Sequence, residues 1–253
     1  MSTKEVVSFV EDSSDSVLEV RDWRDTLLAG QGSALILTDP PYGTTQNKWE
    51  MMLDTAEFYK FAFAANDGGP VVCTSAEPFT SQLVVGAHKN FKYCWYWDKK
   101  LPTGHLNAKK QPLRQVEPIV VAYKTCRTYN PQMTADPRGH RSWHRKNTMT
   151  GSYNPYDEHT YDSGGVKYPT TLLPLYQPPK GKSHPTEKPV ELMEYLIRTY
   201  TNPGDLVVDP FCGTGAVAVA CKITDRKFIG GDINPEYIAT ARSRLDDISS
   251  LRQ

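Results

Sequence analysis

One stretch near the C-terminal end of the chain limits the fold more than any other feature. The apolar run 206–208 leads into a turn that contains Gly213 and Gly215. A helical pattern over 216–223 and a second apolar run over 227–230 follow. A strand, a helix and a strand joined so closely form a β-α-β unit, whose two strands lie parallel in one sheet. Because parallel sheets carry helices on both faces, the sequence predicts an α/β protein.

The rest of the chain repeats this alternation of apolar runs and helical patterns, and no internal repeat interrupts it. We therefore expect one largely parallel sheet with its helices. The predicted strands are 17–20, 34–38, 70–74, 91–97, 118–123, 206–208 and 227–230. The predicted helices are 53–65, 80–88, 189–200, 216–223 and 235–245.

Composition excludes several classes of protein. The 253 residues are 39% hydrophobic and 11% aromatic, which excludes a disordered chain. No apolar run approaches the roughly 18 residues of a membrane-spanning helix. The five cysteines are scattered and the first 16 residues resemble no targeting peptide, so we expect reduced thiols and a cytoplasmic location. His140 and His144 have a spacing seen in metal ligands, but no glutamate or cysteine pair accompanies them, and no metal is expected.

Charge is unevenly distributed, although the whole chain has 29 basic and 29 acidic residues. Residues 99–182 contain 14 basic and 5 acidic side chains, a net charge of +9, together with many tyrosines and prolines. Basic groups interleaved with aromatic rings suit a polyanion with stackable bases. A solvated insertion without a partner is the alternative. The polar part, 125–182, is too long for an ordinary loop, so it is predicted to be an insertion or a small subdomain.

The glycine turn and the acid beyond it indicate a nucleoside site. Gly213 and Gly215 permit close approach of the backbone to a ligand. Asp232 lies 19 positions after Gly213, the separation at which an acid accepts hydrogen bonds from ribose hydroxyls. The turn lacks both a Walker A lysine and the third glycine of a dinucleotide fingerprint, which favours a nucleoside without phosphate, such as S-adenosylmethionine. A turn that only packs strand against helix is the alternative.

The apolar run 34–38 ends in Asp39-Pro40-Pro41-Tyr42. Two prolines fix the chain and remove two N–H donors, which leaves the carbonyl groups near Pro40 free to accept. Ligands of open α/β sheets bind at the carboxyl ends of strands, where this turn is predicted to lie. The Asp39 carboxylate and the Pro40 carbonyl suit the two N–H groups of an exocyclic base amine, and Tyr42 suits stacking on the base. An ordinary turn with a surface tyrosine is the alternative.

Three motifs in one order resemble a known family. Asp-Pro-Pro-Tyr at 39–42, His-Pro-Thr-Glu-Lys-Pro at 184–189 and Phe-Cys-Gly-Thr-Gly at 211–215 are similar to motifs of the S-adenosylmethionine-dependent DNA amino-methyltransferases, in the order of the β group. The resemblance covers about 17–245 and implies a circularly permuted, Rossmann-like sheet of seven strands. It also implies a catalytic half (1–124), a basic target-recognition insertion (125–182) and a cofactor-binding half (183–253).

The resemblance assigns roles to individual residues. The expected catalytic residues are Asp39, Pro40, Pro41 and Tyr42. The expected S-adenosylmethionine residues are Asp22 near the adenine, Thr186 and Lys188 at the methionine end, Asp232 at the ribose, and Asp209, Phe211, Gly213, Thr214 and Gly215 along the pocket. The expected DNA contacts are Lys99, Lys100, Lys109, Lys110, Arg138, Arg141, Arg145 and Lys146.

The implied activity is methylation of the N6 amine of a flipped adenine in a specific DNA sequence. In this family an aspartate at the first position of the catalytic turn favours adenine and a serine favours cytosine, yet cytosine-N4 methylation needs the same chemistry and stays open. RNA or a protein amide as acceptor, and a non-catalytic DNA-binding module, are further alternatives. The expected partner is double-stranded DNA in a bacterial or phage-infected cell, and a homodimer and a cognate restriction enzyme are further partners to consider.

Overall fold

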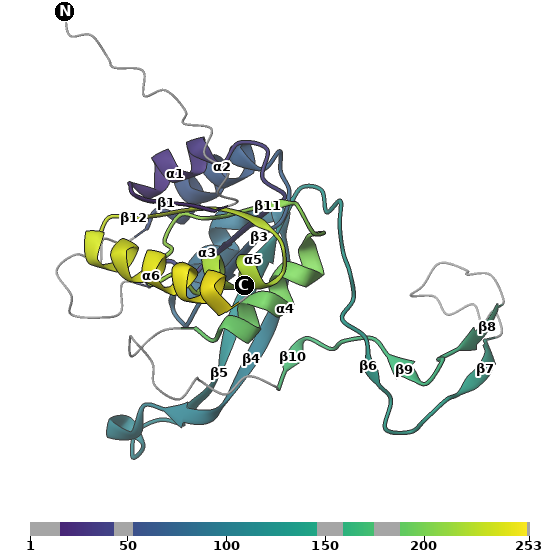
Figure 1. Cartoon of the computed structure of the whole chain (residues 1–253). Coiled ribbons are helices and arrows are strands. Elements are labelled where there is room, and N and C mark those ends of the chain that lie inside the picture. The colour runs from purple at the N-terminus through teal and green to yellow at the C-terminus, as the bar shows by residue number, and fades with distance from the viewer. Residues whose placement is uncertain (1–15, 43–52, 146–158, 175–187, 252–253) are drawn as a thin grey trace, which may run out of the picture.

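A computed structural model of the chain describes residues 16–42, 53–145, 159–174 and 188–251. One central sheet runs through the molecule (Figure 1). Its strands are, in spatial order, β1 (Ser16–Val20), β12 (Lys227–Asp232), β11 (Leu206–Asp209), β2 (Leu35–Thr38), β3 (Val71–Thr74), β5 (Arg114–Ala122), β4 (Phe91–Thr103) and β10 (Leu172–Leu173). The pairs β3–β5 and β5–β4 are antiparallel, and the other neighbouring pairs are parallel.

The α/β class is as predicted, and each of the seven predicted strands is present. The sheet in the described residues has an eighth strand as well. The prediction of seven was wrong because the two-residue strand β10 adds to the edge of β4, where Leu172 pairs with Tyr96 and Leu173 with Trp97. So short a strand has no pattern of its own in the sequence. At the other edge, the N-terminal strand β1 pairs with the C-terminal strand β12. The first and the last strand of the described chain are therefore neighbours in one sheet, and circular permutation stays a prediction.

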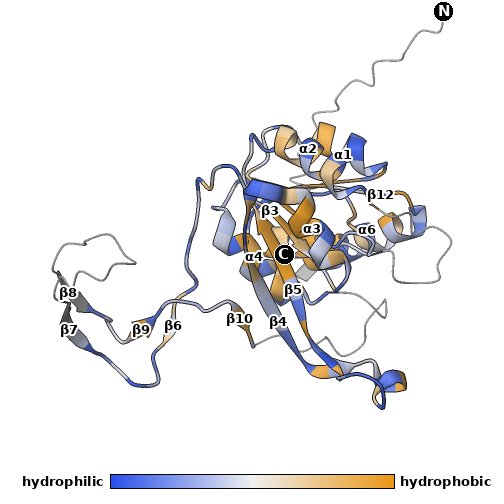
Figure 2. Ribbon diagram, turned by 180° about the vertical axis from the view of Figure 1, so that it is seen from behind, coloured by the Kyte–Doolittle hydropathy of each residue, from blue (hydrophilic) through white to orange (hydrophobic). Residues whose placement is uncertain are grey.

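Six α-helices of the described segments cover the two faces of the sheet. One face carries α1 (Trp23–Ala29), α2 (Thr55–Ala65) and α3 (Phe79–Ala87), and the other carries α4 (Val190–Tyr200), α5 (Ala216–Ile223) and α6 (Pro235–Leu251). The central strands are buried on both sides, and the side chains of Leu35, Ile36 and Leu37 have no exposed surface. Their continuous apolar sequence is the pattern expected for parallel strands between two helical layers. Figure 2 shows the apolar residues concentrated in these layers.

The helix α1 was not predicted from the sequence. It has only seven residues, and it begins at Asp22, whose carboxylate caps the helix by accepting the Arg24 N–H at 2.9 Å. About two turns give too few positions for a helical hydrophobic period. The other five helices begin and end within a few residues of their predicted bounds, except that α6 continues to Leu251.

Two segments project from the sheet (Figure 1). The first is the outer end of the β4–β5 hairpin, which includes a short 3-10 helix, His105–Asn107. The second is an arm within the predicted insertion, built from two ribbons of paired strands. Its pairs are β6 (Thr134–Ala135) with β9 (Val166–Lys167), and β7 (Ser142–Arg145) with β8 (His159–Asp162).

Candidate active site

The carboxyl ends of four parallel strands meet at one edge of the sheet and bring the predicted acids together. Asp39 follows β2, Asp209 ends β11 and Asp232 ends β12. Asp22 lies two residues beyond β1, and the intervening Arg21 N–H donates to the Asp232 carbonyl at 3.0 Å. This edge is where open α/β sheets bind their ligands.

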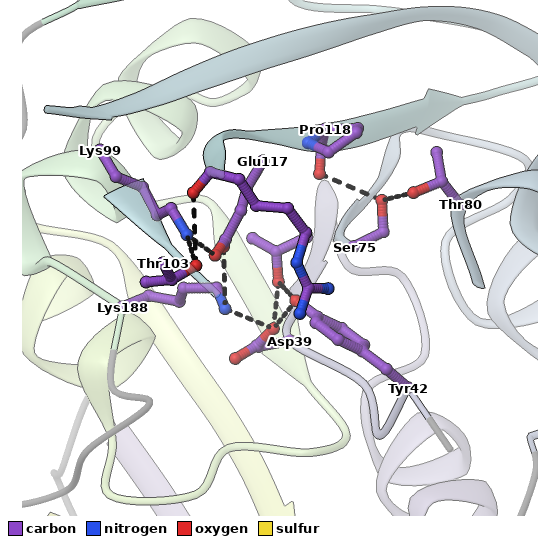
Figure 3. A network of polar contacts seen from close by, with 11 residues as sticks. Asp39, Tyr42, Ser75, Thr80, Lys99, Thr103, Glu117, Pro118 and Lys188 are labelled. Atoms are coloured by element: carbon purple, nitrogen blue, oxygen red, sulfur yellow. Dashed lines mark hydrogen bonds and ion pairs between the residues drawn. The ribbon is translucent and has the colours of Figure 1, made fainter. Parts of the chain in front are cut away.

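The Asp39 carboxylate is held through one of its two oxygens. Oδ1 accepts hydrogen bonds from the Tyr42 hydroxyl at 2.6 Å and from the Thr74 hydroxyl, and it lies 3.3 Å from Lys188 Nζ. Figure 3 shows these groups converging on Asp39. No residue of the described segments donates a hydrogen bond to Oδ2. The carboxylate is therefore fixed in orientation while one oxygen keeps its capacity to accept.

Tyr42 packs inside the protein rather than standing free. Its ring stacks on Phe79, with centroids 5.6 Å apart, and Lys188 Nζ lies 5.4 Å from the centroid of the Tyr42 ring. Burial, followed by the charge of Asp39, raises the pKa of the Tyr42 hydroxyl well above its usual value, so the hydroxyl is a donor. The predicted stacking of Tyr42 on a base stays a prediction, since Phe79 covers one face of the ring.

The two prolines complete this turn. Pro40 is buried and Pro41 is partly buried. Neither has an N–H group. In the part of the chain that the structure describes, no backbone N–H donates to the Pro40 carbonyl. The carbonyl thus keeps its capacity to accept, as the sequence predicts.

Lys188 contacts the candidate catalytic carboxylate directly, and its predicted place at the methionine end of the cofactor stays a prediction. Its side chain is buried, and its ammonium lies between Asp39 and Glu117, 3.3 Å from Asp39 Oδ1 and 3.4 Å from Glu117 Oε2. Burial alone would lower the pKa of Lys188, but the nearby Asp39, Tyr42 and Glu117 outweigh it and raise the pKa above its usual value. Lys188 is therefore a permanent cation that contacts the candidate catalytic carboxylate.

Glu117 is a site residue that sequence reasoning missed. It lies on β5, and its Oε1 lies 3.0 Å from Lys99 Nζ. Its one signal in the sequence is that it is the sole acidic residue between Lys99 and Ala135, directly before the apolar end of a predicted strand.

The glycine turn has the shape that a nucleoside needs. Gly213 has a φ of +48°, and a Cβ placed there would meet no atom within 4 Å, so open space lies beside it. The Gly213 N–H donates to Asp232 Oδ2 at 3.0 Å, and the Asn234 N–H donates to Asp232 Oδ1 at 2.9 Å. Burial raises the pKa of Asp232, and these two bonds oppose the rise. Each carboxylate oxygen keeps a second lone pair for a ribose hydroxyl, so these residues fit a nucleoside cofactor.

The other predicted cofactor residues surround this turn. Phe211 is partly buried, and its ring centroid lies 6.3 Å from that of Trp23, the residue after Asp22. The Thr214 carbonyl accepts from Arg244 at 2.7 Å, which ties the turn to α6. Gly215 has a φ of +83° at the start of α5. Thr186 lies outside the described residues.

Asp209 lies beneath the turn and is fully enclosed. Its Oδ1 accepts from the Thr38 hydroxyl at 2.6 Å and from the Phe211 N–H at 3.1 Å. Burial raises the pKa of Asp209 to about 7, although both hydrogen bonds oppose the rise. Asp209 therefore supports the turn from below rather than facing a ligand.

The predicted DNA-contact residues do not share one environment. Lys99 is buried and paired with Glu117, so we leave it out of the proposed DNA surface. Lys100 is half exposed and pairs with Asp98 at 3.0 Å. Lys109 and Lys110 are exposed on the projecting hairpin.

On the arm, Arg138 is exposed and Arg141 is partly exposed, and both pair with the buried Asp136, at 3.1 and 3.2 Å. Arg145 belongs to β7, but its side chain, like all of Lys146, lies outside the described residues.

Within the described segments, no group of three metal-ligating side chains is present, and no helix is long and apolar enough to cross a membrane. The five cysteines are free thiols, as their spacing predicts.

This site defines the class of the protein. It is an α/β protein whose glycine turn, with the acid at the end of the next strand, fits a nucleoside. A fixed carboxylate at the same sheet edge fits a second polar ligand. The model of the DNA methylase family matches residues 81–243, and the chain belongs to this family. The resemblance drawn from the three motifs is thereby confirmed.

Individual relatives agree with this assignment. The chain is 29% identical over 242 residues to DNA adenine methyltransferase YhdJ of Escherichia coli (strain K12), which covers 84% of this chain and 76% of that protein. The crystal structure of the M1.HpyAVI–SAM complex has 25% identity and a TM-score of 0.61, covering 90% of this chain and 99% of its own. The cytosine-N4-specific PvuII DNA methyltransferase has a TM-score of 0.63, covering 91% of this chain and 86% of its own; its 19% identity shows a shared fold alone.

Proposed function

We propose that this protein transfers a methyl group from S-adenosylmethionine to the N6 amine of an adenine in DNA. The observation that carries the proposal is the Asp39 carboxylate, fixed by Tyr42, Thr74 and Lys188 through Oδ1 with Oδ2 left to accept. It lies at the same sheet edge as the nucleoside turn, where a base amine and a nucleoside cofactor would meet.

The cofactor residues of the proposal are those around the glycine turn. Asp232 would accept the ribose hydroxyls, Gly213 would allow the backbone to approach, and Phe211 and Asp22 would lie toward the adenine. When bound, S-adenosylmethionine supplies a methyl group on a sulfonium, a good leaving group that needs no metal. It is the ligand named for the related M1.HpyAVI complex.

The chemical task of the protein is to activate the amine, whose lone pair is delocalised into the base. Hydrogen bonds from the amine to Asp39 Oδ2 and the Pro40 carbonyl would favour a more pyramidal nitrogen and stabilise the positive charge that develops on it. Holding the nitrogen in line with the methyl group lowers the barrier to transfer further. A base inside a duplex is out of reach, so it must be flipped, at a cost of about a few kcal/mol.

The proposed DNA surface comprises the hairpin and the arm. Residues 125–182 would recognise the target sequence, and basic side chains would contact phosphates. The described ones are Lys100, Lys109, Lys110, Arg138 and Arg141, and the sequence adds Arg145 and Lys146.

Adenine is the proposed base, with cytosine as the alternative. YhdJ, named an adenine methyltransferase, resembles this chain over most of its length. An aspartate at the first position of the turn also favours adenine. Because the PvuII enzyme shares the fold and is specific for cytosine N4, the fold itself does not distinguish the two bases.

The test is to incubate the protein with S-adenosylmethionine and unmethylated genomic DNA, digest the DNA to nucleosides and identify the methylated base by mass spectrometry. We expect N6-methyladenine. N4-methylcytosine would keep the mechanism and overturn the choice of base, whereas the absence of any methylated base would overturn the proposed DNA activity.

A further inference from the structure

Four charged side chains from four parts of the fold form one cluster, in which the two lysines are buried and the two carboxylates are partly buried. Asp39 follows β2, Lys99 lies on β4, Glu117 lies on β5 and Lys188 precedes α4. We call these four residues the charge cluster. Two carboxylates and two ammonium groups give it a formal charge of zero. Figure 3 shows Glu117 between the two lysines, with Lys188 between Glu117 and Asp39.

The contacts are arranged as a chain. Lys99 Nζ lies 3.0 Å from Glu117 Oε1, Glu117 Oε2 lies 3.4 Å from Lys188 Nζ, and Lys188 Nζ lies 3.3 Å from Asp39 Oδ1. Glu117 Oε2 is buried and has no hydrogen-bond donor within the described residues. Its electrostatic attraction is therefore directed at Lys188. The Lys99 ammonium is itself positioned by a hydrogen bond to the Thr103 hydroxyl at 3.0 Å.

The charges around Asp39 affect the rate of methyl transfer. The acceptor nitrogen uses its lone pair to bond the methyl carbon, while the carbon–sulfur bond breaks and its electron pair stays on sulfur. Nitrogen then carries a positive charge until one N–H proton leaves to water. A carboxylate beside the nitrogen stabilises that charge, and an ammonium next to the carboxylate weakens the effect, more so in a site with little water.

Lys188 therefore has two opposite effects. It fixes Asp39 in position, and it reduces the negative potential that Asp39 presents to the amine. A second carboxylate on the far side of Lys188 offsets the second effect and leaves the first intact. Glu117 occupies that place.

We propose that Glu117 is a positioning residue for methyl transfer, which holds Lys188 against Asp39 and offsets its charge so that Asp39 stays effective toward the acceptor amine. The proposal rests on the proposed function and adds to it a residue that contacts neither ligand. It predicts that the net charge of the cluster, and not the presence of a glutamate as such, controls the rate of transfer.

The experiment compares Glu117→Gln with the double variant Lys99→Met/Glu117→Gln. The single variant keeps the side-chain shape but leaves the cluster with one excess positive charge, whereas the double variant returns its charge to zero. Glu191→Gln, an exposed carboxylate at the start of α4, is the matched control. Single-turnover methylation of DNA is measured at a single pH, cofactor and DNA affinities are measured separately, and circular dichroism checks folding.

We expect Glu117→Gln to lower the single-turnover rate about 10- to 100-fold, with affinities changed by less than about threefold. This is less than the roughly 10²- to 10³-fold loss seen when a group that contacts the developing charge is removed. The double variant should regain most of the single-turnover rate. If the single variant fails to fold, the rate of the double variant is compared with that of wild type. The control should match wild type.

Two results overturn the proposal while the proposed function stands. One is a wild-type rate in Glu117→Gln, and the other is a double variant as slow as the single one, which would make Glu117 a merely structural residue. A wild-type protein that methylates no DNA overturns the proposed function and the role of Glu117 with it.

Discussion

The Thr38 hydroxyl donates a hydrogen bond of 2.6 Å to Asp209 Oδ1 and so joins the strand before the catalytic turn to the strand before the glycine turn. Both residues are buried at the ends of neighbouring parallel strands. The two halves of the candidate active site thus share an acid that contacts no solvent.

The burial of Asp209 predicts that the protein becomes less stable as the pH rises. The pKa of Asp209 is about 7 in the folded protein and near 3.8 in the unfolded chain. Its stabilising contribution is therefore complete below about pH 4 and is lost as the pH rises through about 7. The loss amounts to at most about 4 kcal/mol, from about three pKa units.

Asp209→Asn should remove this loss, because the amide stays neutral and its oxygen still accepts from Thr38. The free energy of unfolding in urea is measured at pH 5 and pH 8. We expect wild type to lose about 1–4 kcal/mol more than the variant over this range. Asp246→Asn, at an exposed position of α6, should behave as wild type. Equal pH dependence in Asp209→Asn would show that the carboxyl is not protonated on folding.

Asp39→Ala should abolish methylation and leave cofactor binding largely intact. The carboxylate contacts the acceptor amine in the proposed mechanism, and loss of a comparable group elsewhere lowers the rate about 10²- to 10³-fold. Methylation of DNA and calorimetric binding of S-adenosylmethionine give the two readouts. Loss of cofactor affinity in this variant would remove Asp39 from the catalytic role.

The two glycines of the turn should respond differently to alanine. A Cβ at Gly215 would lie 2.7 Å from the Ala241 Cβ, in addition to the strain of a φ of +83°. We expect Gly215→Ala to destabilise the protein by about 1–3 kcal/mol. A Cβ at Gly213 would enter open space, so Gly213→Ala should mainly weaken cofactor binding.

Gly204→Ala is the control for backbone strain alone, because Gly204 has a φ of +85° and open space around it. Thermal unfolding and cofactor titration are measured for all three variants. Wild-type cofactor affinity in Gly213→Ala would show that no ligand occupies the space beside that glycine.

The exposed hairpin lysines should determine the salt dependence of DNA binding. If Lys109 and Lys110 each neutralise one phosphate, their replacement by alanine should reduce the slope of log affinity against log salt by about 1.8. Lys60→Ala, at an exposed position of α2, is the control for a lysine elsewhere. The slope is measured by fluorescence anisotropy with a DNA duplex. An unchanged slope in the double variant would place the hairpin away from DNA.

Much of the fold was predictable because its signals are local. The strands β2, β11 and β12 appear as short apolar runs, and each is followed by a polar residue that reaches the sheet edge. The glycine turn and Asp232 have fixed spacing along the chain, so their meeting requires only that the β-α-β unit form. The helix α1 and the strand β10 were missed because each is too short to show a period.

The candidate site was predictable only in part, and Lys99 shows why. Its sequence neighbours are basic and suggested a phosphate contact, yet it is buried against Glu117. Nor did the sequence show that Lys188 contacts Asp39. Whether a lysine is exposed depends on which carboxylate packs beside it, and that carboxylate comes from another element of the fold.

The sequence by itself determined the class of sheet, the glycine turn with its acid and the Asp-Pro-Pro-Tyr turn. Hydrophobic period, glycine conformation and proline geometry all act between residues close in the chain. The tertiary structure alone decided the partners of the charges: Glu117 between Lys99 and Lys188, and Lys188 against Asp39. Electrostatic attraction depends on distance in space and on burial, and both arise only when strands from different parts of the chain pair.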